Sequence, residues 1–148
     1  MLLDDVVKNS NYVTDEELND TNVVGLSNSA IAETNSKCGT KLPLFSSENT
    51  SETPYKTLPD FWVLRLVEPY LAYGIAANDT DTNARDFHYN RFLQAVTDFK
   101  DKGLNDIVEE FDPETGEQIT DYAGDSVRMA KIDASDVTLH WKGWIWWL

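Results

Sequence analysis

The sequence is poor in the residues that build catalytic and metal sites. Its 148 residues include one cysteine, Cys38, and two histidines, His88 and His140. A single cysteine cannot form an intramolecular disulfide, and the chain has no Cys-x-x-Cys pair for zinc. It also lacks a His-Glu-x-x-His motif, a glycine-rich phosphate loop and a Gly-x-Ser-x-Gly elbow. We therefore expect that the protein is not an enzyme and uses no cofactor and no metal.

The few reactive side chains have simpler structural interpretations. His88 lies in the aromatic run Phe87-His88-Tyr89, which is typical of a partly buried structural histidine. Cys38 falls near the end of a predicted helix, whereas a thiol pKa is lowered at a helix beginning, so we interpret Cys38 as a packing residue.

Long apolar runs and basic clusters are absent as well. No stretch of about 18 apolar residues is available for a transmembrane helix, and the first residues lack the basic and apolar regions of a secretory signal. Twelve lysines and arginines face 26 acidic residues, which gives a net charge of −14. This charge argues against nucleic acid and anionic membranes as direct ligands and is compatible with a basic partner.

Four of the five tryptophans lie in the last eight residues. This segment is too short to span a bilayer, which takes about 20 apolar residues. Tryptophan is a favoured anchor at protein interfaces, so the segment predicts a partner-binding site. The alternative is that it folds back as a final strand on the core of its own chain. The predicted binding residues are Trp141, Trp144, Ile145, Trp146, Trp147 and Leu148.

Two helices are predicted in the first 40 residues. A capping-box pattern at residues 14–17 (Thr-Asp-Glu-Glu) indicates a short helix through Leu18. A second helix ends at Gly39, which we expect to adopt the left-handed cap conformation. Its small side chains predict close packing against another helix, and its repeating positions are Val23, Ser27, Ala30, Ile31, Thr34 and Cys38. Residues 40–56 read as a long loop.

The centre of the chain predicts an antiparallel helix hairpin. Thr57-Leu58-Pro59-Asp60 begins the first helix, Pro69 should kink it, and a polar turn at residues 78–82 leads into a second helix over residues 83–102. Gly103 is a second candidate for a left-handed cap. The first helix is apolar on two faces, Phe61, Leu64, Val67, Leu71 and Ile75 on one, Trp62, Leu66 and Tyr73 on the other. The second has a broad apolar face of Ala84, Phe87, Arg91, Phe92, Ala95, Val96 and Phe99.

Beyond Gly103 the pattern favours extended structure. Residues 107–111 and 117–120 read as a β-hairpin, with Pro113 and Gly116 in the turn, although helix competes over residues 104–111. Further strands are predicted at residues 126–132 and 137–141. The predicted class is mainly α: a helical bundle built on a long antiparallel helix hairpin, with a small C-terminal β-hairpin and an extended arm. Residues 1–103 would form the helical domain, and residues 104–148 the β-hairpin and tryptophan-rich arm.

The order of these features resembles a known family. A Thr-x-Glu-Glu-Leu opening (residues 14–18) is followed by a small-residue helix, the Leu42-Pro43 loop, and a Pro-Asp-started helix that ends in Tyr-Leu-Ala-Tyr (residues 70–73). A second long helix comes next. This layout, over residues 12–102, resembles the head–tail connector proteins, also called adaptor or head-completion proteins, of tailed bacteriophages. The likeness is one of layout and rests on no diagnostic motif.

The resemblance implies a structural protein of the virion, made in the host cytoplasm and located at the head–tail interface. Such proteins form a ring of 12 copies beneath the portal protein and dock by their chain ends to the portal and to the next tail or stopper protein. DNA would pass through an acidic lumen without specific binding, since like charges repel. The long loop at residues 43–57 and the tryptophan-rich end depart from the family pattern.

The composition leaves another hypothesis open. A small protein with a charge of −14 can act as a nucleic-acid mimic that inhibits a DNA-binding enzyme. Between residues 98 and 136, twelve acidic and four basic residues give a net charge of −8. Turns and bases interrupt these acids, which weakens the mimic hypothesis. An uncharacterised enzyme is the third possibility, and it has no nucleophile–base pair or metal set to support it.

Overall fold

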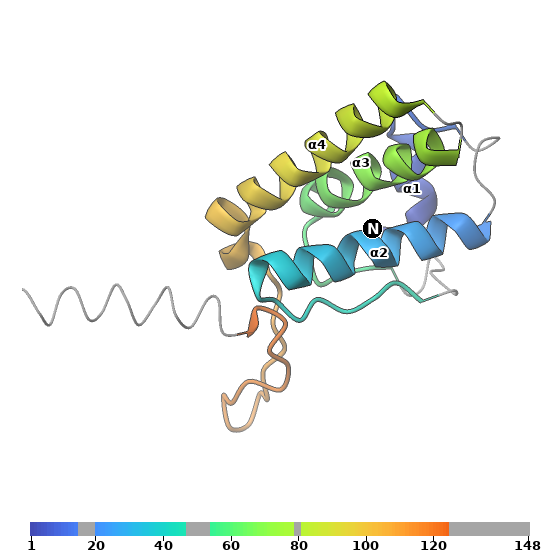
Figure 1. Ribbon diagram of the computed structural model, residues 1–148. Helices are drawn as coiled ribbons and strands as arrows, with labels where there is room; N and C mark the ends of the chain where they lie inside the picture. The colour runs from blue at the N-terminus through green and yellow to red at the C-terminus, as the bar shows by residue number, and fades with distance from the viewer. Residues whose placement is uncertain (15–19, 47–53, 79–80, 125–148) are drawn as a thin grey trace, which may run out of the picture.

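The computed structural model describes residues 1–14, 20–46, 54–78 and 81–124. This part of the chain contains four α-helices. α3 and α4 lie side by side and antiparallel, and α2 packs against α3 and also contacts α4 (Figure 1). The prediction of a mainly α fold around an antiparallel hairpin is confirmed. The elements are α1 (Leu3–Lys8), α2 (Asp20–Cys38), α3 (Asp60–Asn78), α4 (Thr82–Asp98), the π-helical turn η1 (Phe99–Gly103) and the 3-10 turn η2 (Leu104–Asp106).

α3 is the central helix, as its two apolar faces predict. It contacts α1, α2 and α4, and most of its length is buried between them. Phe61 is an exception, because it lies at the first turn with 59% of its surface exposed. Phe87 on α4 is likewise 51% exposed and does not belong to the core face that the sequence predicts. Both exceptions lie near helix beginnings, where the neighbouring helix no longer covers every side. The core of the pair consists of Trp62, Val63, Leu66, Val67, Leu71, Phe92, Val96 and Phe99.

The small-residue face of α2 packs as predicted. Ser27, Ala30, Ile31, Thr34 and Cys38 are buried, and Val23 is partly buried against the core. The approach of α2 to α3 is close at Gly74, where a Cβ would lie 2.6 Å from Cδ1 of Leu26. Because Gly74 has no side chain, the Leu26 side chain can pack directly against the backbone of α3.

The end of α2 and the segment after it are held together by amide side chains. Gly39 has a φ of 68°, which confirms the predicted left-handed cap. The Asn35 side chain accepts from the Leu42 N–H at 2.9 Å and donates to the Leu42 carbonyl at 2.9 Å. Asn28, two turns earlier, makes the same pair of bonds with Phe45. Residues 40–46 form no helix or strand, in agreement with the predicted loop, but they are fastened along α2.

The predictions at the two ends of the hairpin differ in outcome. α3 begins at Asp60, the last residue of the predicted helix start at 57–60, and Asp81 caps α4 by accepting from the Ala84 N–H at 3.1 Å. The left-handed cap at Gly103 is wrong, because its φ is −97° and the helix continues through η1 into η2. Gly103 is instead covered by buried rings, since a Cβ there would lie 2.3 Å from Phe99 and 2.9 Å from Trp62. Glycine is needed at this position for space.

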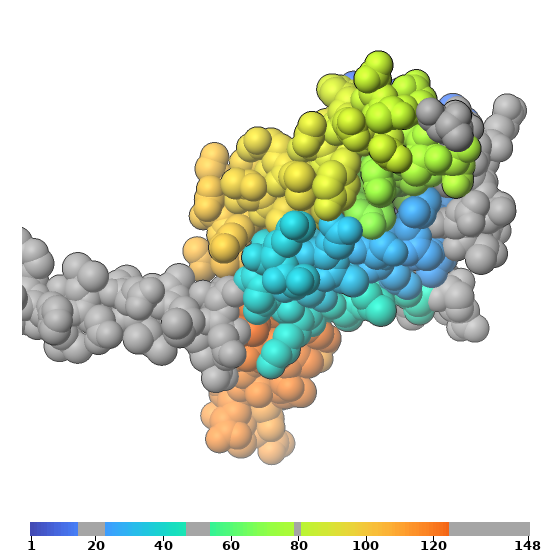
Figure 2. Space-filling view, in the orientation of Figure 1, coloured from blue at the N-terminus to red at the C-terminus, as the bar shows by residue number. Residues whose placement is uncertain are grey.

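The predicted β-hairpin is wrong as a pair of strands. In the described part of the chain it is reduced to one antiparallel bridge between Phe111 and Gln118, although Gly116 has the expected positive φ of 71°. A few backbone hydrogen bonds join the two segments, from the Ile119 N–H to the Glu110 carbonyl and from the Asp112 N–H to the Glu117 carbonyl, and Thr120 Oγ1 accepts from the Glu110 N–H. Isolated two-stranded ribbons are marginal in water, and this one is rich in like charges. We call residues 107–122 the acidic loop; it projects from the helices (Figures 1 and 2).

Several predictions fall outside the described residues. They are the short helix at residues 14–18, the strands at 126–132 and 137–141, and the remainder of the C-terminal arm. The kink expected at Pro69 stays a prediction. Pro69 does lie within α3, where it has no N–H to donate to the carbonyl of Arg65.

Candidate functional site

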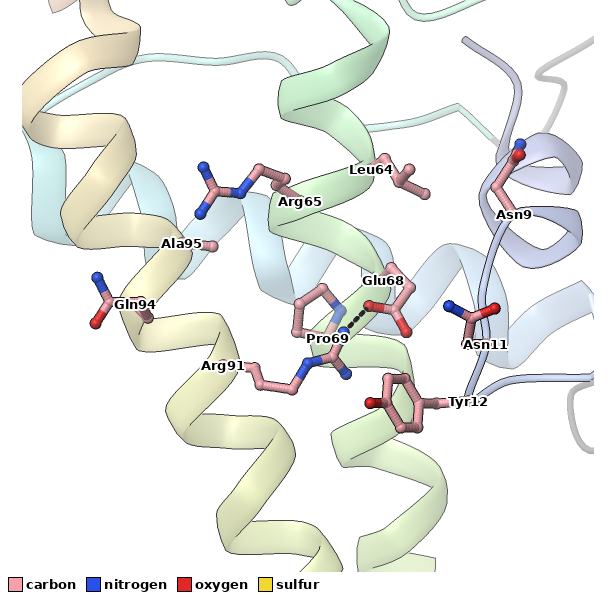
Figure 3. A pocket seen from close by; sticks show the side chains of 10 residues that line it. All are labelled: Asn9, Asn11, Tyr12, Leu64, Arg65, Glu68, Pro69, Arg91, Gln94 and Ala95. Carbon is pink, nitrogen blue, oxygen red and sulfur yellow. Dashed lines mark hydrogen bonds and ion pairs between the residues drawn. The ribbon is translucent and has the colours of Figure 1, made fainter.

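The predicted partner-binding residues, Trp141 to Leu148, lie outside the described part of the chain, as does His140. The candidate site therefore lies on the surface that the structure does describe. One hollow of this surface is an open pocket of about 420 Å³ between α3, α4 and the segment that follows α1 (Figure 3). We call it the α3–α4 pocket. Its lining residues are Asn9, Asn11, Tyr12, Leu64, Arg65, Glu68, Pro69, Arg91, Gln94 and Ala95.

A buried ion pair forms one wall of the pocket. Arg91 reaches from α4 and donates to Glu68 on α3 at 2.5 Å (Figure 3). The Glu68 side chain is only 8% exposed, and its other oxygen accepts from the Ser10 hydroxyl at 2.8 Å. A buried carboxylate needs such compensation, since an uncompensated buried charge is costly. The pair thus ties α4 and the segment after α1 to the central helix.

The second arginine of the pocket is also paired. Arg65 donates to Asp98 at 2.5 Å, and its guanidinium lies 5.4 Å from the ring centroids of both Phe61 and Trp62. The hydrogen bond from Arg65 holds the pKa of Asp98 below its usual value. Neither arginine therefore presents an uncompensated positive charge to the pocket.

Aromatic rings lie beside the ion pair. The Arg91 guanidinium lies 4.3 Å from the centroid of the Tyr12 ring, a cation–π distance. Tyr12 packs edge-on against Phe87 at 6.2 Å and against His88 at 5.0 Å. Tyr12 and Phe87 are both about half exposed. The pocket is thus bordered by aromatic surface that the described part of the chain leaves open.

His88 has the structural role that the sequence predicts. It is buried beneath this aromatic edge, and its Nδ1 lies 3.0 Å from Nη1 of Arg91. Because arginine only donates, Nδ1 is the acceptor. Burial, and then the charge of Arg91, lower the pKa of His88, while Glu68 opposes the shift. The imidazole is therefore held neutral as a support for Arg91.

A second polar cluster crosses all three long helices. Glu33 on α2 accepts hydrogen bonds from the hydroxyls of Tyr70 on α3 and Tyr89 on α4, both at 3.2 Å. Burial and the nearby Glu33 raise the pKa of Tyr70 to about 12. The same two causes raise the pKa of Tyr89. This cluster joins the three long helices.

Cys38 is buried against the carbonyl of Val96, and burial raises its thiol pKa, which disfavours the nucleophilic thiolate. Within the described ranges, no three side chains of the metal-ligating types are grouped to hold an ion. No helix of the described residues is long and apolar enough to cross a membrane.

The sequence indicates part of this site, but not its assembly. Glu68 is an acid within the apolar run of α3, which is a signal for a buried carboxylate with a partner. Arg91 lies on the face of α4 that the sequence predicts to be apolar, and no pattern in the sequence marks Tyr12. Both are brought to Glu68 by packing between segments distant in the chain.

Comparison with known proteins adds no relatives: no protein-family model, curated protein or solved structure matches this chain.

Proposed function

We propose that the protein is a head–tail connector, a structural adaptor that forms a ring between the portal and the tail of a tailed-phage virion. The observation that carries the proposal is the order and packing of its elements. A small-residue helix, α2, packs on the antiparallel pair α3 and α4, in the sequence order of the connector layout. The proposed copy number of 12 and the portal and tail or stopper partners come from the resemblance alone.

The distribution of exposed apolar side chains supports an assembling protein. A subunit of a ring needs two different contact surfaces, one for each neighbour. Tyr12 and Phe87 form one exposed group near the beginning of α4. Val108, Phe111 and Ile119 are each more than half exposed along the acidic loop, which follows the far end of α4 (Figure 1). Large apolar side chains gathered on a strongly charged protein mark interaction surfaces.

The acidic loop supports a channel that DNA passes without adhering. Residues 103–124 contain seven acidic residues and no lysine or arginine. In a ring that turns this loop inward, repulsion from phosphates would prevent binding. The proposed arm, residues 141–148, would dock by burying its tryptophans in a neighbouring protein.

The test is the native mass of the full chain, measured by light scattering over a concentration series, alone and with a portal protein. A ring of about a dozen copies, or a monomer that becomes a ring only on a portal, supports the proposal. We expect that deletion of Trp144 to Leu148 abolishes assembly and retains a cooperative thermal transition. Replacement of the same residues by a Gly-Ser segment of equal length controls for length. Loss of cooperative unfolding in both variants would show that the segment belongs to the core.

A second candidate function, inhibition of a DNA-binding enzyme by mimicry of nucleic acid, is favoured by the projecting acidic loop. A monomer that forms a one-to-one complex with a basic enzyme would support it. The affinity of that complex should fall steeply with salt, whereas docking through tryptophans should depend on salt only weakly.

A further inference from the structure

We propose that the α3–α4 pocket receives a tryptophan from residues 141–147 of a second copy of the chain. The inference rests on the proposed ring and names the receptor for the arm of each subunit. It identifies a binding site on described residues and the chemical class of its ligand, an indole side chain.

The charges of the pocket disfavour an ionic ligand. Arg91 is paired with Glu68, and Arg65 with Asp98, each at 2.5 Å. An anion would add negative charge beside carboxylates that already balance both guanidinium groups. A cation would meet the two guanidinium groups at close range. The pocket therefore fits an uncharged group better than either kind of ion.

The surfaces of the pocket match an indole. Leu64, Pro69 and Ala95 supply apolar contacts for the ring. The Tyr12 ring offers an edge or a face for stacking, and the adjacent guanidinium of Arg91 can engage an aromatic face. The side-chain amides of Asn9, Asn11 and Gln94 at the rim supply oxygens that can accept the indole N–H. Pockets of about 300–1,000 Å³ accommodate small organic ligands, and this one measures about 420 Å³.

The chain itself carries the matching ligand. Of its five tryptophans, Trp62 is buried in the core and donates its indole N–H to Asp106 at 2.8 Å. The other four are Trp141, Trp144, Trp146 and Trp147. No acidic side chain lies among them, and the one charged side chain of the segment is Lys142, two residues from Trp144.

The length of the arm and the symmetry of a ring favour a neighbouring copy. The last described residue, Gly124, is 20 positions before Trp144, and a fully extended chain of that length reaches about 65 Å. The central helix, α3, has 19 residues and is about 28 Å long. The arm can thus extend well past its own subunit. A contact between an arm on one copy and a pocket on the next joins two different surfaces, which is the kind of contact that closes rings.

The test is photo-crosslinking within the full-length protein. The variant Trp144→p-benzoyl-phenylalanine is prepared in normal and isotopically heavy forms, mixed, irradiated and mapped by mass spectrometry. We expect crosslinks between heavy and light copies, from position 144 to peptides containing residues 9–12 or 91–95. Adding Tyr12→Ser should lower their yield roughly tenfold, the size of effect seen when an interface anchor is removed. Leu44→Ser, which alters another exposed apolar residue, should leave the yield unchanged.

Three results would overturn the inference: crosslinks confined to one copy, crosslinks between copies that avoid the pocket, or a yield insensitive to Tyr12→Ser. Light scattering on the same samples separates this failure from that of the proposed function. A ring-sized particle without pocket crosslinks leaves the ring intact and removes only the receptor. A protein that stays monomeric with and without a portal, and forms no crosslinks between copies, contradicts both.

Discussion

Alanine at Gly103 should destabilise the protein through packing alone. The φ of −97° at Gly103 is accessible to any residue, so no backbone strain is involved. The added Cβ would lie 2.3 Å from Cδ2 of Phe99 and 2.9 Å from Cε2 of Trp62, and both rings are buried. Overfilling a packed core costs about 1–3 kcal/mol, while alanine recovers up to about 1 kcal/mol of helix propensity. We expect the free energy of unfolding to fall by about 1–2 kcal/mol.

The same substitution at Gly39 should cost about 1 kcal/mol for a different reason, the positive φ of 68°. Asparagine tolerates this conformation better than alanine, so Gly39→Asn should restore part of the loss. At Gly103 asparagine should do further harm, because it is larger. The order of alanine and asparagine is therefore opposite at the two sites.

Urea unfolding of the five proteins, wild type, both alanine variants and both asparagine variants, measures these differences as midpoint shifts at constant slope. Gly25→Ala is the matched control, since Gly25 lies within α2 and no described atom would come within 4 Å of its Cβ. It should raise stability by about 0.5–1 kcal/mol. Equal responses of Gly39 and Gly103 to asparagine would refute the distinction between conformation and space.

Three further predictions concern the buried polar groups. Arg91→Leu strands the Glu68 carboxylate and should cost about 3–5 kcal/mol, while the double variant with Glu68→Gln should recover much of it, measured by a double-mutant cycle. Tyr70→Phe removes a hydrogen bond to Glu33. The pKa of Tyr70 is about 12 in the folded protein and 10.0 in the unfolded protein, so the stability of the wild type should decline from pH 10 to 12. Over this range the free energies of unfolding of the wild type and the variant should converge. The pKa of His88 is lowered in the folded protein, so the free energy of unfolding should decrease as the pH falls below about 6.5, the unfolded value. His88→Gln should make the free energy of unfolding less dependent on pH in this range. No such change would be seen if His88 were exposed and titrated freely.

The three long helices, α2, α3 and α4, were predictable because their signals are local, whereas the short α1 was not predicted. The stripe of Ser27, Ala30 and Thr34 gave the buried face of α2, and Asp60 and Asp81 marked the beginnings of the two hairpin helices. The glycine signal was ambiguous by nature. Glycine supplies both left-handed conformation and absence of volume, and sequence does not distinguish Gly39, which needs the first, from Gly103, which needs the second.

The pocket was not predictable because it depends on contacts between distant segments. Glu68 signals a buried acid, but the choice of Arg91, 23 positions later on another helix, and of Ser10, 58 positions earlier, follows from the packing of three segments. The prediction of a β-hairpin in the acidic loop was wrong for a related reason. Its alternation and turn residues were suitable for two strands, yet no second layer covers them among the described elements, and marginal ribbons need such support.

The positions of the acidic side chains in the structure weaken the hypothesis of a nucleic-acid mimic. A mimic must present its carboxylates outward at regular intervals, whereas many acids here serve the fold. Both oxygens of Glu109 accept backbone N–H groups, from Tyr122 and Ala123. Asp106 accepts from the indole of Trp62, and Glu33 accepts from two tyrosines. The acids that hold helices and loops together are not available to imitate phosphates. These neutral donors leave the net charge unchanged, but they fix the carboxylates in positions that the fold requires rather than at the spacing of phosphates. The exposed aromatic groups are suited to protein contacts, which is why we place the connector ahead of the mimic.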